Sequence, residues 1–125
     1  MTDDTITLKE LREKMARFVA ERDWQQFHTP KNLSMSIAIE AAELMEHFQW
    51  LSAEQSQDLP PEKLAEVGEE LADILIYALS MSNALGLDLA RTVLAKMDKN
   101  RRKYPAEKVR GLAHKYSWYC DRDGR

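Results

Sequence analysis

Two pairs of carboxylates interrupt stretches of the sequence that are otherwise apolar and helical in character. Glu40 and Glu43 form the first pair, and Glu70 and Asp73, which precede the apolar run 74–79, form the second. Residues three apart lie on one face of a helix, so each pair projects both carboxylates in the same direction. Burying ionised carboxylates is costly unless they pair with cations or bind a metal, and neither helix face carries a nearby Lys or Arg. The sequence therefore predicts helices that pack around a divalent cation.

Helix signals predict an all-α fold with four main helices, because no stretch shows the alternation typical of strands. The first helix is expected to begin at a capping box formed by Thr7 and Glu10 and to end before a connection at residues 23–30. The second helix is expected at about residues 31–50. The third is expected at residues 61–85, with Pro61 in its first turn and Gly86 ending it. The fourth is expected to begin after an Asp88 cap and to end just before Pro105. Residues 52–60 are expected to be a polar linker, and the residues after Pro105 an irregular basic tail.

Length and composition predict one domain spanning residues 1–125, with a helical core at about 7–104 and the tail at 105–125. The third helix is apolar around much of its circumference, so the protein is expected to be a homodimer or homotetramer. No apolar run is long enough to cross a membrane, and no leader pattern is evident, so a soluble, cytoplasmic protein is expected. The single cysteine, Cys120, fits a reducing compartment.

The charge distribution is uneven although the net charge is only −3. Residues 1–95 carry 8 Lys/Arg and 17 Asp/Glu, a balance of −9, and residues 96–125 carry 10 and 4, a balance of +6. An acidic overall balance argues against general nucleic-acid binding. An acidic body with a basic end suits a site that holds a metal on one side and phosphate on the other.

Helical spacing predicts which side chains accompany the carboxylates. Two stripes are expected, one on each helix: Glu40, Glu43, His47 and Trp50, and Glu66, Glu70, Asp73 and Tyr77. Oxygen ligands favour Mg²⁺, with Mn²⁺ as the alternative, over zinc or copper. The three scattered histidines do not form a zinc site, the spacing of His47 does not match a di-iron motif, and the isolated glycines do not form a phosphate loop.

Five motifs together resemble the MazG-like all-α nucleoside triphosphate pyrophosphohydrolases, and more closely their dCTP pyrophosphatase branch. They extend over most of the chain: residues 21–28 (ERDWQQFH), 30–33 (PKNL), 43–50 (Glu-Leu to Phe-Gln-Trp), 69–77 (Glu-Glu-Leu to Tyr) and 96–105 (KMDKNRRKYP). Two positions depart from patterns within the family. Ile39 precedes Glu40 at a position where many members have a second Glu. Met15 stands at a position where animal members have a histidine that contacts the nucleotide.

The resemblance implies a four-helix MazG-like bundle that hydrolyses a nucleoside triphosphate between the α and β phosphates with Mg²⁺. dCTP or a modified dCTP is the implied substrate, and sanitation of the nucleotide pool the implied task. The four carboxylates match the metal ligands and catalytic residues, and Glu43 or Glu40 is the candidate to accept a proton from water. The residues that match the enclosure of base and sugar are Trp24, Gln25, Gln26, Phe27, His28, Trp50 and Tyr77. Those that match phosphate contacts are Lys96, Asn100, Arg101, Tyr104 and Lys115.

Other interpretations of the same residues remain open at the level of sequence. The protein could hydrolyse nucleoside triphosphates with broad specificity, or be a non-catalytic helical oligomer with a structural Mg²⁺. Trp24 and Trp50 could be core or interface aromatics, and His28 could cap a helix. Tyr77 could simply hydrogen-bond a carboxylate.

Overall fold

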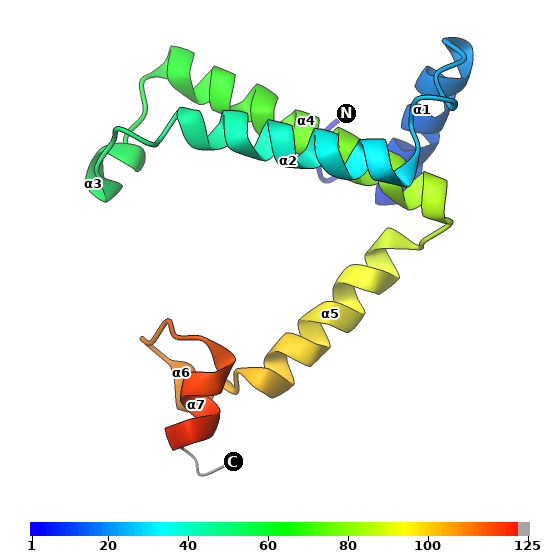
Figure 1. Ribbon diagram of the computed structural model, residues 1–125. Coiled ribbons are helices and arrows are strands. Elements are labelled where there is room, and N and C mark those ends of the chain that lie inside the picture. Colours follow the sequence, from blue (N-terminus) through cyan, green and yellow to red (C-terminus); the bar gives the residue numbers. More distant parts are fainter. Residues whose placement is uncertain (123–125) are drawn as a thin grey trace. The chain divides into compact units, whose positions relative to one another are not determined.

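The computed structural model describes residues 1–122, and that part of the chain contains helices and no strand (Figure 1). The helices are α1 (Leu8–Glu21), α2 (Pro30–Glu46), α3 (Ala53–Ser56), α4 (Pro61–Leu85), α5 (Leu89–Lys103), α6 (Ala106–Val109) and α7 (Tyr116–Arg122). The predicted all-α class is confirmed. The four long helices α1, α2, α4 and α5 correspond to the four that the sequence predicts. No helix within residues 1–122 has both the length and the apolar character needed to span a bilayer.

The described part of the chain divides into two compact units, the first of residues 1–87 and the second beginning at Asp88. In the first unit, α2 packs along α4, and α1 packs against α4 as well (Figure 1). Val19 of α1, Leu33 of α2 and Leu79 of α4 are the buried apolar side chains of this unit. The core is therefore small, and it lies toward the end of α4 that α1 covers.

A pair of hydrogen bonds also ties α1 to α4. The Asn83 side-chain amide donates to the Arg12 carbonyl oxygen at 3.0 Å, and Arg12 Nε donates to Asn83 Oδ1 at 3.2 Å. Both bonds are partly buried, and each joins residues 71 positions apart in the chain. Because both polar ends of the amide are engaged, Asn83 holds α1 at a defined position on α4.

Most predicted helix ends are confirmed. The Thr7 hydroxyl accepts the Glu10 amide at 3.1 Å, and the Glu10 carboxylate accepts the Thr7 amide at 2.7 Å, which completes the capping box. Pro61 occupies the first turn of α4, and Gly86 ends that helix at φ +67°, a left-handed conformation in which glycine avoids a Cβ clash. The Asp88 carboxylate caps α5 by accepting the Arg91 amide at 2.9 Å.

The expected extent of the second helix, to Trp50, was wrong. α2 ends at Glu46, because the next two amides turn to acceptors three residues back; the His47 amide donates to the Leu44 carbonyl at 3.2 Å. The Phe48 amide donates to the Met45 carbonyl at 2.9 Å in the same way. Turns of this kind have about three residues per turn in place of 3.6, so they shift the side chains that follow out of the α-helical spacing. Trp50 therefore does not continue the α2 stripe on which Glu40 lies.

The sequence predicts a polar linker at residues 52–60, but this segment contains the short helix α3. The Ser52 hydroxyl accepts the Gln55 amide at 3.1 Å, and the Gln55 side chain accepts the Ser52 amide at 2.9 Å. A capping box of this kind satisfies orphan amides at a helix start. A four-residue helix is too short to show an apolar period, which is why the pattern of hydrophobic residues does not predict it.

The expectation of an irregular segment after Pro105 was also wrong, because this part of the second unit contains α6 and α7. Tyr119 is its buried aromatic residue, and its hydroxyl accepts the His114 amide at 3.1 Å. The Tyr119 ring also meets the Tyr104 ring edge-on, with centroids 5.8 Å apart. Aromatic side chains thus give a short, charged segment its own small core.

Candidate functional site

Carboxylates from α2 and α4 meet where these two helices run along each other. Glu40, Glu43 and Glu70 each have an oxygen atom within 4.8 Å of the corresponding oxygen atoms of the other two. Asp73 lies outside this group of three, but its charge acts on Glu40. The structure therefore brings together three of the four predicted metal ligands and places the fourth nearby.

Two oxygen atoms of this cluster are buried and have no hydrogen-bond partner, namely Oε2 of Glu40 and Oε2 of Glu70. None of the ion pairs found within residues 1–122 involves the four carboxylates. Buried polar atoms normally have partners, so unpaired atoms of this kind need an explanation. Three clustered carboxylates fit a hard divalent cation such as Mg²⁺ or Mn²⁺, which takes oxygen ligands.

The electrostatics of the cluster show in the pKa of Glu40, which is raised from 4.5 to about 7. The largest cause is a side-chain hydrogen bond with the adjacent Glu70. This bond requires a proton between the two carboxylates, so it favours the protonated form of Glu40. Desolvation and the Glu43 carboxylate add to the effect, and the charge of Asp73 contributes as well. A bound cation would reverse this preference, because it stabilises the ionised carboxylates.

His47 and Glu66 were expected on the carboxylate stripes, but they form a separate polar group with Lys63. Lys63 Nζ lies 3.0 Å from the Glu66 carboxylate and 3.3 Å from His47 Nδ1. The Glu66 carboxylate and His47 Nδ1 are 3.7 Å apart. The Lys63 ammonium lowers the pKa of Glu66, so this glutamate is satisfied without a metal.

The loop between α1 and α2 carries the aromatic residues of the first motif. Trp24 packs edge-on against Phe18 with ring centroids 5.9 Å apart, and the His28 ring lies 6.2 Å from the Trp24 ring. The His28 amide donates to the carbonyls of Trp24 and Gln25, both at 3.2 Å, so the loop folds back on itself. Phe27 and Gln26 are exposed.

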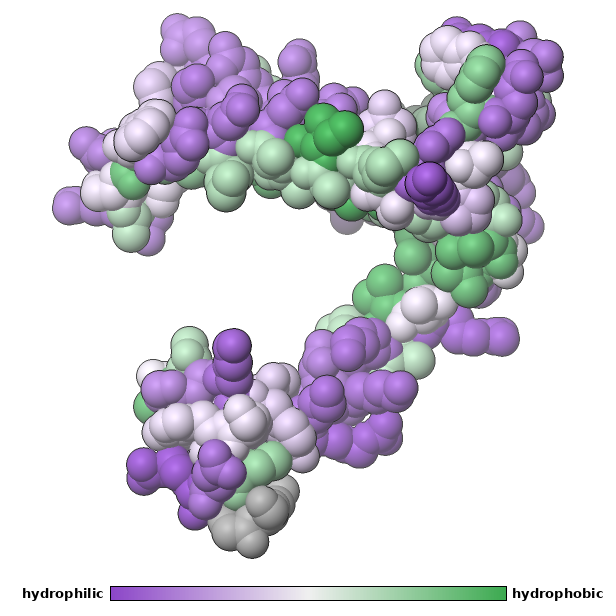
Figure 2. All heavy atoms as spheres, viewed as in Figure 1, coloured by the Kyte–Doolittle hydropathy of each residue, from purple (hydrophilic) through white to green (hydrophobic). Residues whose placement is uncertain are grey.

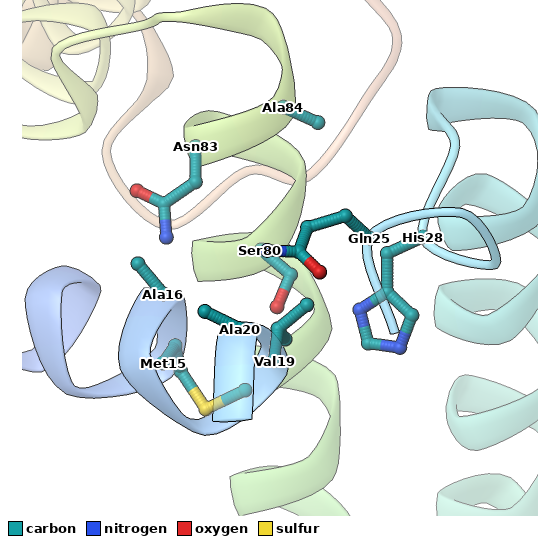
Figure 3. A pocket seen from close by; sticks show the side chains of 9 residues that line it. All are labelled: Met15, Ala16, Val19, Ala20, Gln25, His28, Ser80, Asn83 and Ala84. Atoms are coloured by element: carbon teal, nitrogen blue, oxygen red, sulfur yellow. The ribbon is translucent and has the colours of Figure 1, made fainter. Parts of the chain in front are cut away.

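A cavity of about 430 Å³ lies between this loop, α1 and α4 (Figure 3). Gln25 and His28 line it from the loop, so two of the residues predicted to enclose a base reach the same hollow. Ser80 and Asn83 line it from α4, and sequence reasoning missed both. They stand among Leu, Met and Ala residues, and isolated small polar residues on a helix carry no motif that would single them out.

The remaining predicted residues lie at several places. Tyr77 is half-buried on α4, one turn after Asp73, whereas Trp50 is 87% exposed in the turns after α2. The predicted phosphate contacts belong to the second unit: Lys96, Asn100 and Arg101 on α5, Tyr104 at its C-terminal cap and Lys115 before α7. Arg101 forms an ion pair with Asp98 one turn earlier on α5.

Known proteins resemble the chain in both sequence and fold. The MazG-like family model matches residues 35–117, which include all four carboxylates and most of the basic segment. dCTP pyrophosphatase 1 of Mus musculus is 44% identical over 113 residues, a stretch covering 89% of this chain and 66% of the mouse protein. The Bos taurus protein of the same name is 46% identical, with 89% and 67% covered. The chain thus spans about two thirds of the length of these relatives.

A solved structure, a pyrophosphatase from Archaeoglobus fulgidus, matches with a TM-score of 0.75 and 40% sequence identity. The match covers 84% of this chain and 98% of that one. The helical fold thus agrees with the sequence comparisons. The chain belongs to the MazG-like family.

Glu40 generates a prediction about the pH dependence of stability. Its pKa of about 7 in the folded state lies above the unfolded value of 4.5, so its proton stabilises the fold below pH 4.5. This contribution should be lost as the pH rises to about 7 in the presence of a chelator. Relative to Glu40→Gln, the parent's free energy of unfolding, measured by urea titration, should therefore fall over this range.

Saturating Mg²⁺ should abolish that fall in the parent, because a cation competes with the proton and binds more tightly as the pH rises. Glu54→Gln, which changes an exposed carboxylate on α3, is the matched control and should follow the parent. Parallel curves for the parent and Glu40→Gln in chelator would show that the cluster does not hold the Glu40 proton.

Proposed function

We propose that this protein hydrolyses dCTP or a modified dCTP between the α and β phosphates, giving the monophosphate and pyrophosphate. The observation that carries the proposal is the cluster of Glu40, Glu43 and Glu70, with two buried and unpaired oxygen atoms. A chain similar to dCTP pyrophosphatases over 89% of its length, with such a cluster, has the ligands that a metal-dependent phosphoanhydride hydrolase needs. The task is removal of unwanted nucleotides from the cytoplasmic pool.

In this proposal the four carboxylates, Asp73 included, hold Mg²⁺, and Mn²⁺ can replace it. When bound, the cation neutralises phosphate charge and lowers the pKa of a water ligand. The glutamates of α2 and α4 would hold the cation that positions the triphosphate for in-line attack, a reaction that depends on positioning and charge stabilisation more than on a covalent nucleophile. Glu40 and Glu43 are the candidates to accept the proton from the attacking water.

The remaining predicted residues bind the nucleotide. The loop residues Trp24 to His28, together with Tyr77 and Trp50, enclose the base and sugar; the cavity beside His28 and the exposure of Trp50 support this assignment. Lys96, Asn100, Arg101, Tyr104 and Lys115 contact the phosphates. The net charge of +6 over residues 96–125 supports that role, because it complements a triphosphate.

We also propose that the chain works as a homodimer or homotetramer in which residues 1–125 form one domain. Large apolar side chains are exposed along α2 and α4 of the first unit (Figure 2). Among them are Ile39 at 57%, Leu71 at 57% and Leu75 at 45% exposure. Val93, Leu94 and Met97 of α5 are exposed as well. Monomers rarely leave so many large apolar side chains in water, so a second copy is the fitting cover.

The experiment that tests the proposed activity is pyrophosphate release from a panel of deoxynucleoside and ribonucleoside triphosphates, with Mg²⁺ and with chelator. Release from dCTP above the other nucleotides, and only with a divalent cation, is the expected result. Equal release from all bases would indicate a broad pyrophosphohydrolase. Absence of release from every nucleotide would leave a helical oligomer with a structural metal.

Asp73→Asn should abolish turnover while leaving the fold without metal as stable as the parent, or slightly more stable. The change removes one charge and one ligand but nearly keeps the shape of the side chain. Mg²⁺ at a hundredfold excess over its Kd should stabilise the parent by about 2.7 kcal/mol, and the variant should lose most of this gain. Thermal melting in Mg²⁺ and in chelator measures both effects.

Glu69→Gln, on the same helix but outside the cluster, is the control for Asp73→Asn and should keep the full Mg²⁺ response. An Asp73→Asn variant that is destabilised in chelator and responds normally to Mg²⁺ would contradict the metal site. That behaviour belongs to an ordinary buried carboxylate that accepts structural hydrogen bonds.

Trp50→Ala should raise KM for the preferred nucleotide by the equivalent of about 1–3 kcal/mol, the range for stacking of a base on an aromatic ring. Because Trp50 is 87% exposed, the change removes little packing within the chain. Discrimination among bases should narrow, and Trp50→Phe should restore part of it. Steady-state kinetics on the nucleotide panel make the measurement, and an unchanged KM with an unchanged ranking of bases would remove Trp50 from the site.

Multi-angle light scattering at micromolar concentration should give the mass of a dimer or tetramer. Leu71→Glu and Leu75→Glu, which place charges on the exposed apolar part of α4, should shift the mass toward that of the monomer. Glu62→Lys, in the first turn of α4, serves as a charge-changing control and should not alter the mass. A monomeric mass for the parent would contradict the proposed assembly.

A further inference from the structure

The cavity beside His28 has mostly small and apolar walls and two polar atoms without partners. Met15, Ala16 and Ala20 line it from α1, and Ala84 from α4 (Figure 3). The two polar atoms are the Ser80 hydroxyl oxygen and His28 Nδ1, both buried and both without a hydrogen bond. An apolar hollow with a few convergent polar atoms is the usual form of a small-molecule site.

Ser80 differs from two other helical serines of this chain, Ser34 and Ser82. The Ser82 hydroxyl donates to the Leu79 carbonyl at 2.7 Å, and the Ser34 hydroxyl donates to the Lys31 carbonyl, also at 2.7 Å. Such bonds back to the preceding turn are the ordinary way for a helix to satisfy a serine. The Ser80 side chain makes no such bond although the residue is only 5% exposed. The Ser80 hydroxyl therefore keeps unused hydrogen-bonding capacity in a residue that lines the cavity.

His28 offers the second atom from the loop between α1 and α2 (Figure 3). Its amide is held by the carbonyls of Trp24 and Gln25, and its ring lies 6.2 Å from the Trp24 ring, so its position is set by the loop. Nδ1 is nevertheless unsatisfied. Asn83, which also lines the cavity, is already committed because both ends of its amide bond Arg12. Ser80 and His28 are thus the buried groups with free hydrogen-bonding capacity.

The cavity lies at a suitable place relative to the carboxylates. Ser80 follows Asp73 by seven residues on α4, which corresponds to about two turns and returns nearly to the same helix face. The rise along the helix is about 10 Å. Tyr77 stands between them on that face, at steps of four and three residues. A nucleotide whose phosphates lie at the carboxylates can therefore extend along α4 with its base toward Ser80.

We propose that the Ser80 hydroxyl is a specificity-determining contact that reads the edge of the base together with His28 Nδ1. The inference rests on the proposed nucleotide hydrolysis. Cytosine presents an exocyclic amine, a donor, beside the ring nitrogen N3, an acceptor. His28 with its proton on Nε2 accepts from the amine at Nδ1, and Ser80 donates to N3. Thymine presents a carbonyl in place of the amine and an N–H in place of N3, so it pairs only with the other tautomer, in which His28 carries its proton on Nδ1. Cytosine is therefore the better ligand as long as His28 keeps its proton on Nε2.

Calorimetric titration of deoxycytidine monophosphate and thymidine monophosphate in chelator tests this contact without turnover. Ser80→Ala should bind the cytidine nucleotide about tenfold more weakly, the size expected when one hydrogen bond to a buried group is lost. The affinity of this variant for the thymidine nucleotide should change little, so the ratio of the two affinities should fall. Ser82→Ala, which removes a buried hydroxyl that bonds its own helix, is the matched control and should bind like the parent.

The kinetic counterpart is kcat/KM for dCTP and dTTP, which should show the same loss of discrimination in Ser80→Ala. Ser80→Cys nearly keeps the volume of the side chain but is a weaker donor, so it should lose part of the discrimination between dCTP and dTTP. It also provides a second variant in case Ser80→Ala fails to fold. Equal affinities for the parent, Ser80→Ala and Ser80→Cys would overturn the inference. So would a changed oligomeric mass with unchanged nucleotide binding, because the cavity would then receive a side chain of a second copy.

The inference and the proposed function can fail separately. If the parent hydrolyses dCTP and Ser80→Ala does so with unchanged base preference, the contact is wrong and the activity stands. If the parent binds the cytidine nucleotide through Ser80 but releases no pyrophosphate, the contact stands and the activity is wrong.

Discussion

On facing sides of α2 and α4, three carboxylates lie with oxygen atoms within 4.8 Å of one another, and two of their oxygen atoms are buried without partners. Their mutual repulsion opposes the packing of the two helices. A hydrogen bond with Glu70, desolvation and the neighbouring charges raise the pKa of Glu40 to about 7, so Glu40 tends to keep a proton here. Only a small apolar core, with Leu33 and Leu79 at its centre, holds the helices against this repulsion. The arrangement is costly without a cation and favourable with one, so binding and folding of this unit are linked.

The all-α class, the long helices and most of their ends could be predicted because each depends on local chemistry, such as the Thr7 capping box or the glycine after α4. The meeting of the two carboxylate pairs was likewise implied by spacing within apolar helices. The end of α2 and the helices α3, α6 and α7 could not be predicted, because they depend on backbone turns and aromatic contacts rather than on an apolar period. Ser80 was hidden for a similar reason, since its importance lies in a hydrogen bond that it does not make.

Polar side chains at the start of α4 have partners within the chain, whereas two buried polar atoms farther along the helix have none. Near its start, Lys63 pairs with the Glu66 carboxylate and contacts His47 Nδ1, so these polar groups have partners within the chain. Farther along, Glu70 and then Ser80 remain unsatisfied. Unsatisfied buried groups weaken a fold, and they persist where a ligand supplies the missing partners. This contrast within one helix is the structural reason to place the metal at the carboxylates and the base at the cavity.

Anomalous diffraction from crystals grown with Mn²⁺ tests the central claim most directly, because it locates the cation itself. The account predicts a manganese peak within coordination distance of oxygen atoms from Glu40, Glu43 and Glu70, and its loss when Glu70 is replaced by Gln. A peak elsewhere in the chain, or a fully ordered carboxylate cluster with no manganese between its oxygen atoms, would contradict the account.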